Sequence, residues 1–155
     1  MRGAPYPLNG ANDLTTSGPS ACAGHDAGSS LISPYAQRYE VLIEDLRVQA
    51  YIGVNPGELR QPQLLVVTIR LEIAPCQRDD LRDTVDYRRI ADEAQRLASR
   101  PTGLIETFAA RLARWSLQSD NVAMAEVVIA KPGALTNALA KTRVTLTKAL
   151  MGSGM

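Results

Sequence analysis

Residues 39–73, YEVLIEDLRVQAYIGVNPGELRQPQLLVVTIRLEI, decide the fold of this chain. Apolar residues alternate on odd positions as far as Ile43, and then on even positions as far as Val54. Because side chains on a strand repeat every two residues, this change of parity predicts a bulge in one long strand or a break between two short ones. After a turn rich in Asn, Pro and Gly, a second alternating run covers residues 65–73. The stretch predicts a long antiparallel hairpin with one buried face.

Beyond the hairpin, the apolar spacing changes to the period of a helix. Asp86 can cap a first helix, whose predicted buried stripe comprises Ile90, Ala91, Ala94, Leu97 and Ala98. Thr102 is the expected cap of a second helix, with an apolar stripe of Leu104, Ile105, Phe108, Ala109, Leu112 and Trp115. Two more strands are expected at residues 122–131 and 142–147. The order β-β-α-α-β-β predicts an α+β fold with two helices on one face of an antiparallel sheet. The two edges of a sheet with such long strands are expected to pair with other subunits.

Composition and charge limit the classes of function. The first 38 residues are rich in Gly, Pro, Ser, Ala and Asn and are predicted to form a disordered tail, which leaves one domain at residues 39–150. A net charge of +1 gives no reason to expect nucleic acid or an anionic membrane as a partner. With one histidine (His25) and two cysteines (Cys22 and Cys76), the chain has no ligand cluster for a metal. No apolar run is long enough to span a membrane, and a cytoplasmic location is expected.

Four polar residues stand at the ends of otherwise apolar elements. They are Glu58 in IGVNPGELRQPQ, Tyr87 in DTVDYRRI, Glu106 in GLIETFAARLA and Lys131 in VVIAKPGAL. Two carboxylates, a phenol and an amine can bind a flat hydrogen-bonding heterocycle and move protons on it without a metal. Each residue alone also fits a structural role, such as a first-turn carboxylate that the helix dipole favours or a solvated lysine before a turn.

The segments IEDLRVQAYIGVNPGELRQPQ, DTVDYRRIADEA, LIETFAARLA and AKPGAL occur in this order within residues 40–148 and together resemble dihydroneopterin aldolases. The resemblance implies the tunnelling fold, in which subunits join their sheets into a barrel ring. It implies a homo-oligomer, a tetramer ring or an octamer of two rings, with active sites between subunits. The implied reaction is retro-aldol cleavage of 7,8-dihydroneopterin in folate biosynthesis, accompanied by side-chain epimerisation and without a cofactor.

The resemblance also implies a role for each polar residue. Glu106 would accept hydrogen bonds from the amino group and ring N–H of the pterin. Lys131 would move protons, through a water, between the 2′-hydroxyl and N5 of the substrate. Tyr87 would supply or remove the proton at the side-chain carbon. Glu58 would either hold the substrate's hydroxyls or position Lys131 and the water.

Further implications concern the substrate contacts and the subunits that supply them. Ile105 and Val85 are expected to contact the substrate. Glu58 and Tyr87 are expected to come from one subunit, and Glu106 and Lys131 from its neighbour. The chain departs from the family pattern in its tail and in the segment 139–144, which contains an extra residue.

Two other functions remain open at this point. An epimerase of dihydroneopterin triphosphate would need basic residues near the substrate's side chain, for which Arg60 is a candidate. A catalytically silent, pterin-binding ring scaffold is the second alternative.

Overall fold

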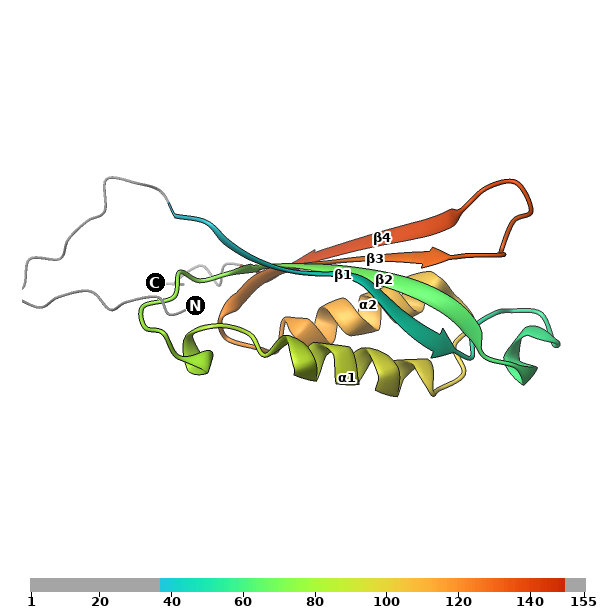
Figure 1. Cartoon of the computed structure of the whole chain (residues 1–155), viewed down its shortest axis with the longest axis horizontal. Helices are drawn as coiled ribbons and strands as arrows, with labels where there is room; N and C mark the ends of the chain where they lie inside the picture. The colour runs from blue at the N-terminus through green and yellow to red at the C-terminus, as the bar shows by residue number, and fades with distance from the viewer. Residues whose placement is uncertain (1–36, 150–155) are drawn as a thin grey trace, which may run out of the picture. The chain divides into compact units, whose positions relative to one another are not determined.

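The computed structural model describes residues 37–149, so nearly all of the predicted tail lies outside the described residues. The elements are β1 (Tyr39–Ala50), η1 (Glu58–Arg60), β2 (Gln63–Ile73), η2 (Leu81–Asp83), α1 (Tyr87–Ala98), α2 (Ile105–Ser116), β3 (Val122–Lys131) and β4 (Ala140–Thr147). The strands form one antiparallel sheet in the order β1-β2-β3-β4, and both helices cover the same face (Figure 1). The predicted α+β layer is therefore confirmed. In the described part of the chain, no helix is long and apolar enough to cross a membrane.

The parity change in the first strand is a β-bulge. Ile43 pairs with Ile69 and Leu46 pairs with Val67, so two residues of β1 lie opposite one residue of β2. Asp45 absorbs the extra length with a positive φ of 53°, a conformation that Asp adopts more readily than most residues. Of the two alternatives left open by the sequence, one continuous strand with a bulge is correct.

The expectation that the first strand continues to Val54 is wrong, because the backbone beyond Ala50 bonds elsewhere. The N–H of Tyr51 donates to the carbonyl of Ala98 (3.2 Å), and the N–H of Gly53 donates to the carbonyl of Thr102 (3.1 Å). These bonds draw residues 51–53 away from β2 and onto the linker between α1 and α2. Val54 consequently lies at the surface with 70% of its area exposed.

The core fills the space between the helices and one face of the sheet. Its strand residues include Val48, Leu65, Val67, Ile69, Leu71, Ala125, Val127 and Ile129. Its helix residues are Ile90, Ala94, Leu97 and Ala98 from α1 and Phe108, Ala109, Leu112 and Ala113 from α2. Both predicted helical stripes are thus largely confirmed, although Leu104 is exposed because it precedes the first turn of α2.

The predicted helix caps have different outcomes. Asp86 accepts a hydrogen bond from the N–H of Arg88 and caps α1 as expected. The expectation that Thr102 caps α2 is wrong, since the N-cap position is Leu104 and has no side-chain cap. The hydroxyl of Thr102 instead donates to the carbonyl of Arg100, and its backbone is bonded to residues 51–53.

Candidate active site

Glu58 and Lys131 form the centre of the candidate site. Lys131 is the last residue of β3, and its Nζ donates to Oε1 of Glu58 at 2.8 Å. The side chain of Lys131 is 13% exposed and that of Glu58 is 27% exposed, so the pair is partly shielded from water. Glu58 and Lys131 are far apart in the sequence. They are brought together because β3 pairs with β2 and ends beside the turn that precedes β2 (Figure 1).

The other carboxylate oxygen of Glu58 organises its own turn. Oε2 accepts hydrogen bonds from the N–H of Val54 (3.1 Å) and from the N–H and side-chain amide of Asn55 (both 3.0 Å). The hydrogen bond from Lys131, followed by that from the Asn55 backbone, lowers the pKa of Glu58 to about 2. Glu58 is therefore an ionised carboxylate whose acceptor positions are largely occupied, which suits it to fix Lys131 in place.

Gly53 makes room for this arrangement. It has a positive φ of 145°, and a methyl group at its α-carbon would lie only 2.5 Å from Cβ of Glu58. Carbon atoms at van der Waals contact are separated by about 3.5–4.0 Å, so no larger residue fits here without displacing Glu58. Gly53 is required both for its backbone conformation and for the close approach of the carboxylate.

Residues 51–53 connect the Glu58 turn to the start of α2. Besides the two bonds that hold Tyr51 and Gly53, the N–H of Thr102 donates to the carbonyl of Tyr51 at 2.9 Å. This short parallel bridge places the α1–α2 linker, and hence the first turn of α2, at the same end of the sheet as Glu58 and Lys131 (Figure 1). Glu106 lies in that first turn, and its exposed carboxylate has no ion-pair or hydrogen-bond partner among residues 37–149.

Tyr87 and Val85 lie at or just before the start of α1, away from the Glu58–Lys131 pair. Tyr87 is the first residue of α1, whereas the last residue, Ala98, contacts the segment that carries Glu58. A helix rises about 1.5 Å per residue, so Tyr87 is separated from Ala98 by roughly 16 Å along the axis of α1. Tyr87 is 61% exposed. A single chain therefore does not bring its four candidate residues together.

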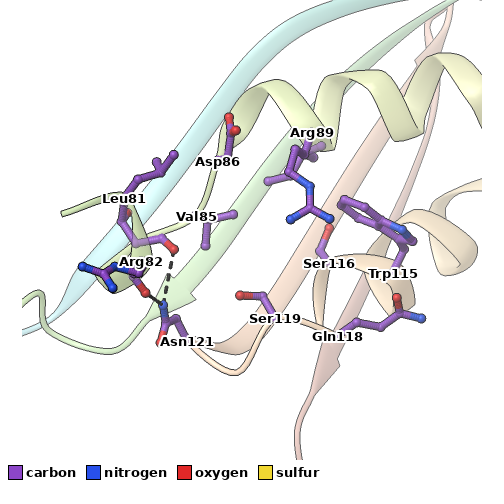
Figure 2. A pocket seen from close by; sticks show the side chains of 12 residues that line it. Leu81, Arg82, Val85, Asp86, Arg89, Trp115, Ser116, Gln118, Ser119 and Asn121 are labelled. Atoms are coloured by element: carbon purple, nitrogen blue, oxygen red, sulfur yellow. Dashed lines mark hydrogen bonds between the residues drawn. The ribbon is translucent and has the colours of Figure 1, made fainter.

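A cavity of about 480 Å³ lies beside Val85, between the start of α1 and the end of α2 (Figure 2). Its wall includes Trp115 and the aliphatic side chain of Ile90, with Arg89 and Gln118 at its polar margin. None of Glu58, Glu106 or Lys131 lines this cavity. It is therefore separate from the site around the Glu58–Lys131 pair.

Comparison with known proteins identifies the family. Residues 41–147 match the family model for dihydroneopterin aldolase. The chain belongs to the dihydroneopterin aldolase family. The dihydroneopterin aldolase of Streptomyces coelicolor is 34% identical over 98 residues, which are 61% of this chain and 82% of that protein. The folic acid synthesis protein FOL1 of Dictyostelium discoideum is 30% identical over 100 residues, 62% of this chain but only 15% of that protein.

A solved structure of the family has the same fold. The crystal structure of E. coli dihydroneopterin aldolase in complex with neopterin superposes with a TM-score of 0.62 and 29% sequence identity. The likeness covers 70% of this chain and 98% of that one. The structural likeness therefore extends over nearly the whole length of the E. coli enzyme, and the remaining length of this chain lies outside it.

The structure corrects one expectation about this aldolase-like domain. Glu58 and Lys131 were expected from different subunits, but they form an ion pair within one chain. The physical reason is the sheet register: Val66 pairs with Ala130, so the end of β3 must lie beside the turn before β2. The altered segment 139–144 does not disturb this, because Ala140 pairs with Lys131 and β4 starts there.

Two supporting residues were missed in the sequence. The side-chain amide of Gln63 donates to the carbonyls of Ile52 and Glu58, the latter at 3.3 Å. It thereby links the two ends of the Glu58 turn. The backbone of Thr102, in the linker between α1 and α2, is hydrogen-bonded to Tyr51 and Gly53 of the same segment. A polar residue at the first position of a strand and a threonine beside a proline carry no sequence signal of such a role.

Proposed function

We propose that this protein cleaves 7,8-dihydroneopterin into 6-hydroxymethyl-7,8-dihydropterin and glycolaldehyde, and that it also epimerises the substrate's side chain. The 2.8 Å contact between Lys131 and Glu58 carries the proposal, because it fixes an amine beside an ionised carboxylate at one edge of the domain. Glu106, exposed at the same end and without a partner in residues 37–149, supports it as an acceptor for the pterin. A cytoplasmic location is part of the proposal.

The proposed chemistry needs only proton transfers from the protein. A base takes the proton of the 2′-hydroxyl, the C1′–C2′ bond breaks, and glycolaldehyde leaves. The bonding electrons move through C1′ into the C6=N5 imine, and N5 takes a proton. In the second half, C1′ gains a proton while N5 loses one, which gives the hydroxymethyl product. Lys131 serves the first proton transfers through a water, and Tyr87 serves the proton at C1′.

Glu58 acts in this scheme by positioning Lys131. Its Oε2 is engaged by three hydrogen bonds from the turn, and its Oε1 accepts from the lysine, so the carboxylate is poorly placed to be a proton acceptor. With a pKa of about 2, it remains ionised throughout the neutral range. This supports the second of the two roles considered for Glu58.

The complete site, in this proposal, needs a second copy of the chain. Tyr87 and Val85 lie at the other end of α1 from the Glu58–Lys131 pair, and the pterin is too small to bridge roughly 16 Å within one subunit. The edge strands β1 and β4 run in opposite directions in the four-stranded antiparallel sheet, so β4 of one copy can continue antiparallel into β1 of the next. Repetition of this contact closes a ring of four subunits, and two such rings form an octamer.

The reaction is tested by incubating the purified protein with 7,8-dihydroneopterin and separating the products. We expect glycolaldehyde, 6-hydroxymethyl-7,8-dihydropterin and the epimer of the substrate. Epimerisation of dihydroneopterin triphosphate, without cleavage of 7,8-dihydroneopterin, would establish the epimerase alternative. Pterin binding with no product from either compound would establish the silent scaffold. Either result would overturn the proposal.

The shared site is tested by mixing inactive variants after dissociation and reassembly. In an equal mixture of Tyr87→Ala and Lys131→Ala, a site is complete only where a Lys131→Ala copy supplies Tyr87 and a Tyr87→Ala copy supplies Lys131. This arrangement occurs at about a quarter of the contacts between subunits, so about a quarter of the sites should regain activity. The matched control is Glu58→Ala mixed with Lys131→Ala. This control should regain nothing, since both residues belong to the same half-site. Equal recovery in both mixtures would disprove the assignment.

A further inference from the structure

The helices α1 and α2 and the linker between them carry a concentration of arginine. Between residues 87 and 116 the chain has no lysine and six arginines, which are Arg88, Arg89, Arg96, Arg100, Arg111 and Arg114. The same segment contains three acidic residues. Arginine differs from lysine in its planar fork of donors, which matches the geometry of phosphate oxygens. The preference for arginine is therefore a reason to look for an anion site.

Four of these arginines surround one cavity. Arg96, Arg100, Arg111 and Arg114 line a hollow of about 500 Å³ between the second half of α1 and the second half of α2, together with Trp115. A volume of this size lies in the range of small-molecule sites. Trp115 and Gln118 also line the neighbouring cavity beside Val85, so the two hollows share part of their walls.

The positive charge of this cavity is largely uncompensated. Glu93 is the one carboxylate among its lining residues, and it binds Arg96 through two contacts of 2.5 and 2.6 Å. In the described residues 37–149, Arg100, Arg111 and Arg114 have no ion-pair partner. Like charges this close repel one another, and a bound anion would remove that repulsion.

Glu93 also fixes the position of one guanidinium group in the cavity. Glu93 is buried to 7% exposure within α1, and its two hydrogen bonds hold the guanidinium of Arg96 in a single orientation. Arg111 is held as well, because its Nη1 donates to the hydroxyl of Thr102 at 3.4 Å. Two of the four guanidinium groups are thus anchored, and Arg100 and Arg114 are available to close over a ligand. Several preorganised donors around one hollow suit a ligand with adjacent oxyanions.

We propose that this cavity binds a pyrophosphate-bearing small molecule at a site distinct from the pterin site. A diphosphate group offers adjacent negative oxygens to several arginine forks, and Trp115 supplies a flat apolar wall for the rest of the ligand. The site is independent of the proposed aldolase reaction, since Glu58, Glu106 and Lys131 do not line it.

The chain provides its own reporter for the test. Trp115 is the only tryptophan and lines this cavity as well as the one beside Val85, so its fluorescence reports ligand binding in either cavity, and the arginine variants identify which cavity is occupied. Inorganic pyrophosphate should produce a saturable change in the fluorescence of the assembled wild-type protein at constant ionic strength. Isothermal titration calorimetry should give the same dissociation constant. Arg100→Gln and Arg114→Gln should each weaken binding by about tenfold or more, and a lysine at either position should restore only part of the affinity.

Controls distinguish a site from general charge attraction. Arg143→Gln removes an exposed arginine from β4, outside the cavity, and should leave pyrophosphate binding unchanged. Citrate at matched ionic strength should compete poorly. The proposal is overturned if calorimetry detects no binding, if citrate binds as well as pyrophosphate, or if Arg143→Gln weakens binding as much as the cavity variants. Cleavage of 7,8-dihydroneopterin is measured on the same preparations, so loss of the aldolase reaction and loss of this site are distinguishable.

Discussion

The replacement of Gly53 by alanine tests how tightly the Glu58–Lys131 pair is held. The added methyl group would lie 2.5 Å from Cβ of Glu58, so Glu58 or the turn must move by about 1 Å to reach normal van der Waals separation. A shift of that size is enough to lose the 2.8 Å hydrogen bond to Lys131. Misplacement of a catalytic group by about 1 Å can lower the rate about a hundredfold. The left-handed φ adds strain of about 1–3 kcal/mol.

The assay compares kcat for 7,8-dihydroneopterin cleavage with the free energy of unfolding in urea. Two other glycines separate the causes: Gly133 also has a positive φ but has open space around it, and Gly57 has open space and an ordinary φ. Gly133→Ala should lose stability by backbone strain with a smaller loss of kcat, and Gly57→Ala should change neither quantity appreciably. A folded Gly53→Ala protein with the wild-type kcat would refute the reasoning, because the ion pair would then not depend on this close approach.

Three further predictions concern the charged groups of the site. The folded-state pKa of Glu58, about 2, lies below its ordinary value of 4.5, so its stabilising effect is complete above that value and declines as the pH falls toward 2. The difference in Tm between wild type and Glu58→Gln should therefore shrink on acidification, and a constant difference would contradict the assignment. Glu106→Ala should weaken pterin binding about thirty- to a thousandfold, measured by fluorescence titration, whereas Lys131→Ala should bind nearly normally and lose about 10²–10⁴-fold in single-turnover rate. Loss of pterin binding in Lys131→Ala with an unchanged single-turnover rate would disprove its role. Because the substrate supplies its own imine, activity should survive EDTA, and borohydride with substrate should trap no adduct on Lys131.

The fold could be predicted from the sequence where the pattern of apolar residues is local. The parity change after Ile43 located the irregularity in the first strand, which the structure shows to be a bulge, and the cap at Asp86 identified the start of α1. The strand end at Ala50 could not be predicted in the same way. Ile52 and Val54 continue the alternation, but hydrogen bonds from Tyr51 and Gly53 to the α1–α2 linker redirect the backbone. Such bonds join residues about fifty positions apart, and side-chain periodicity carries no information about them.

The candidate site shows the same limit. The motifs indicated which residues have the required chemistry, but the pairing of Lys131 with Glu58 follows from the register of β2 with β3. A register is set by the whole hairpin, so the residue spacing alone did not reveal that both residues come from one chain. Gln63 and Thr102 were missed for a related reason, since their roles depend on backbone carbonyls and amides that the sequence does not distinguish.

The bulge in β1 also affects which other proteins this chain can pair with. An open strand edge exposes unpaired backbone groups to any extended segment, including those of unrelated or misfolded chains. At Asp45, two residues occupy the space of one, and the strand bends and twists more strongly there. A flat strand of an aggregate cannot follow that curve over the length of β1, whereas a strand with matching twist can. The single extra residue therefore makes a long, exposed edge selective for a partner strand of matching twist.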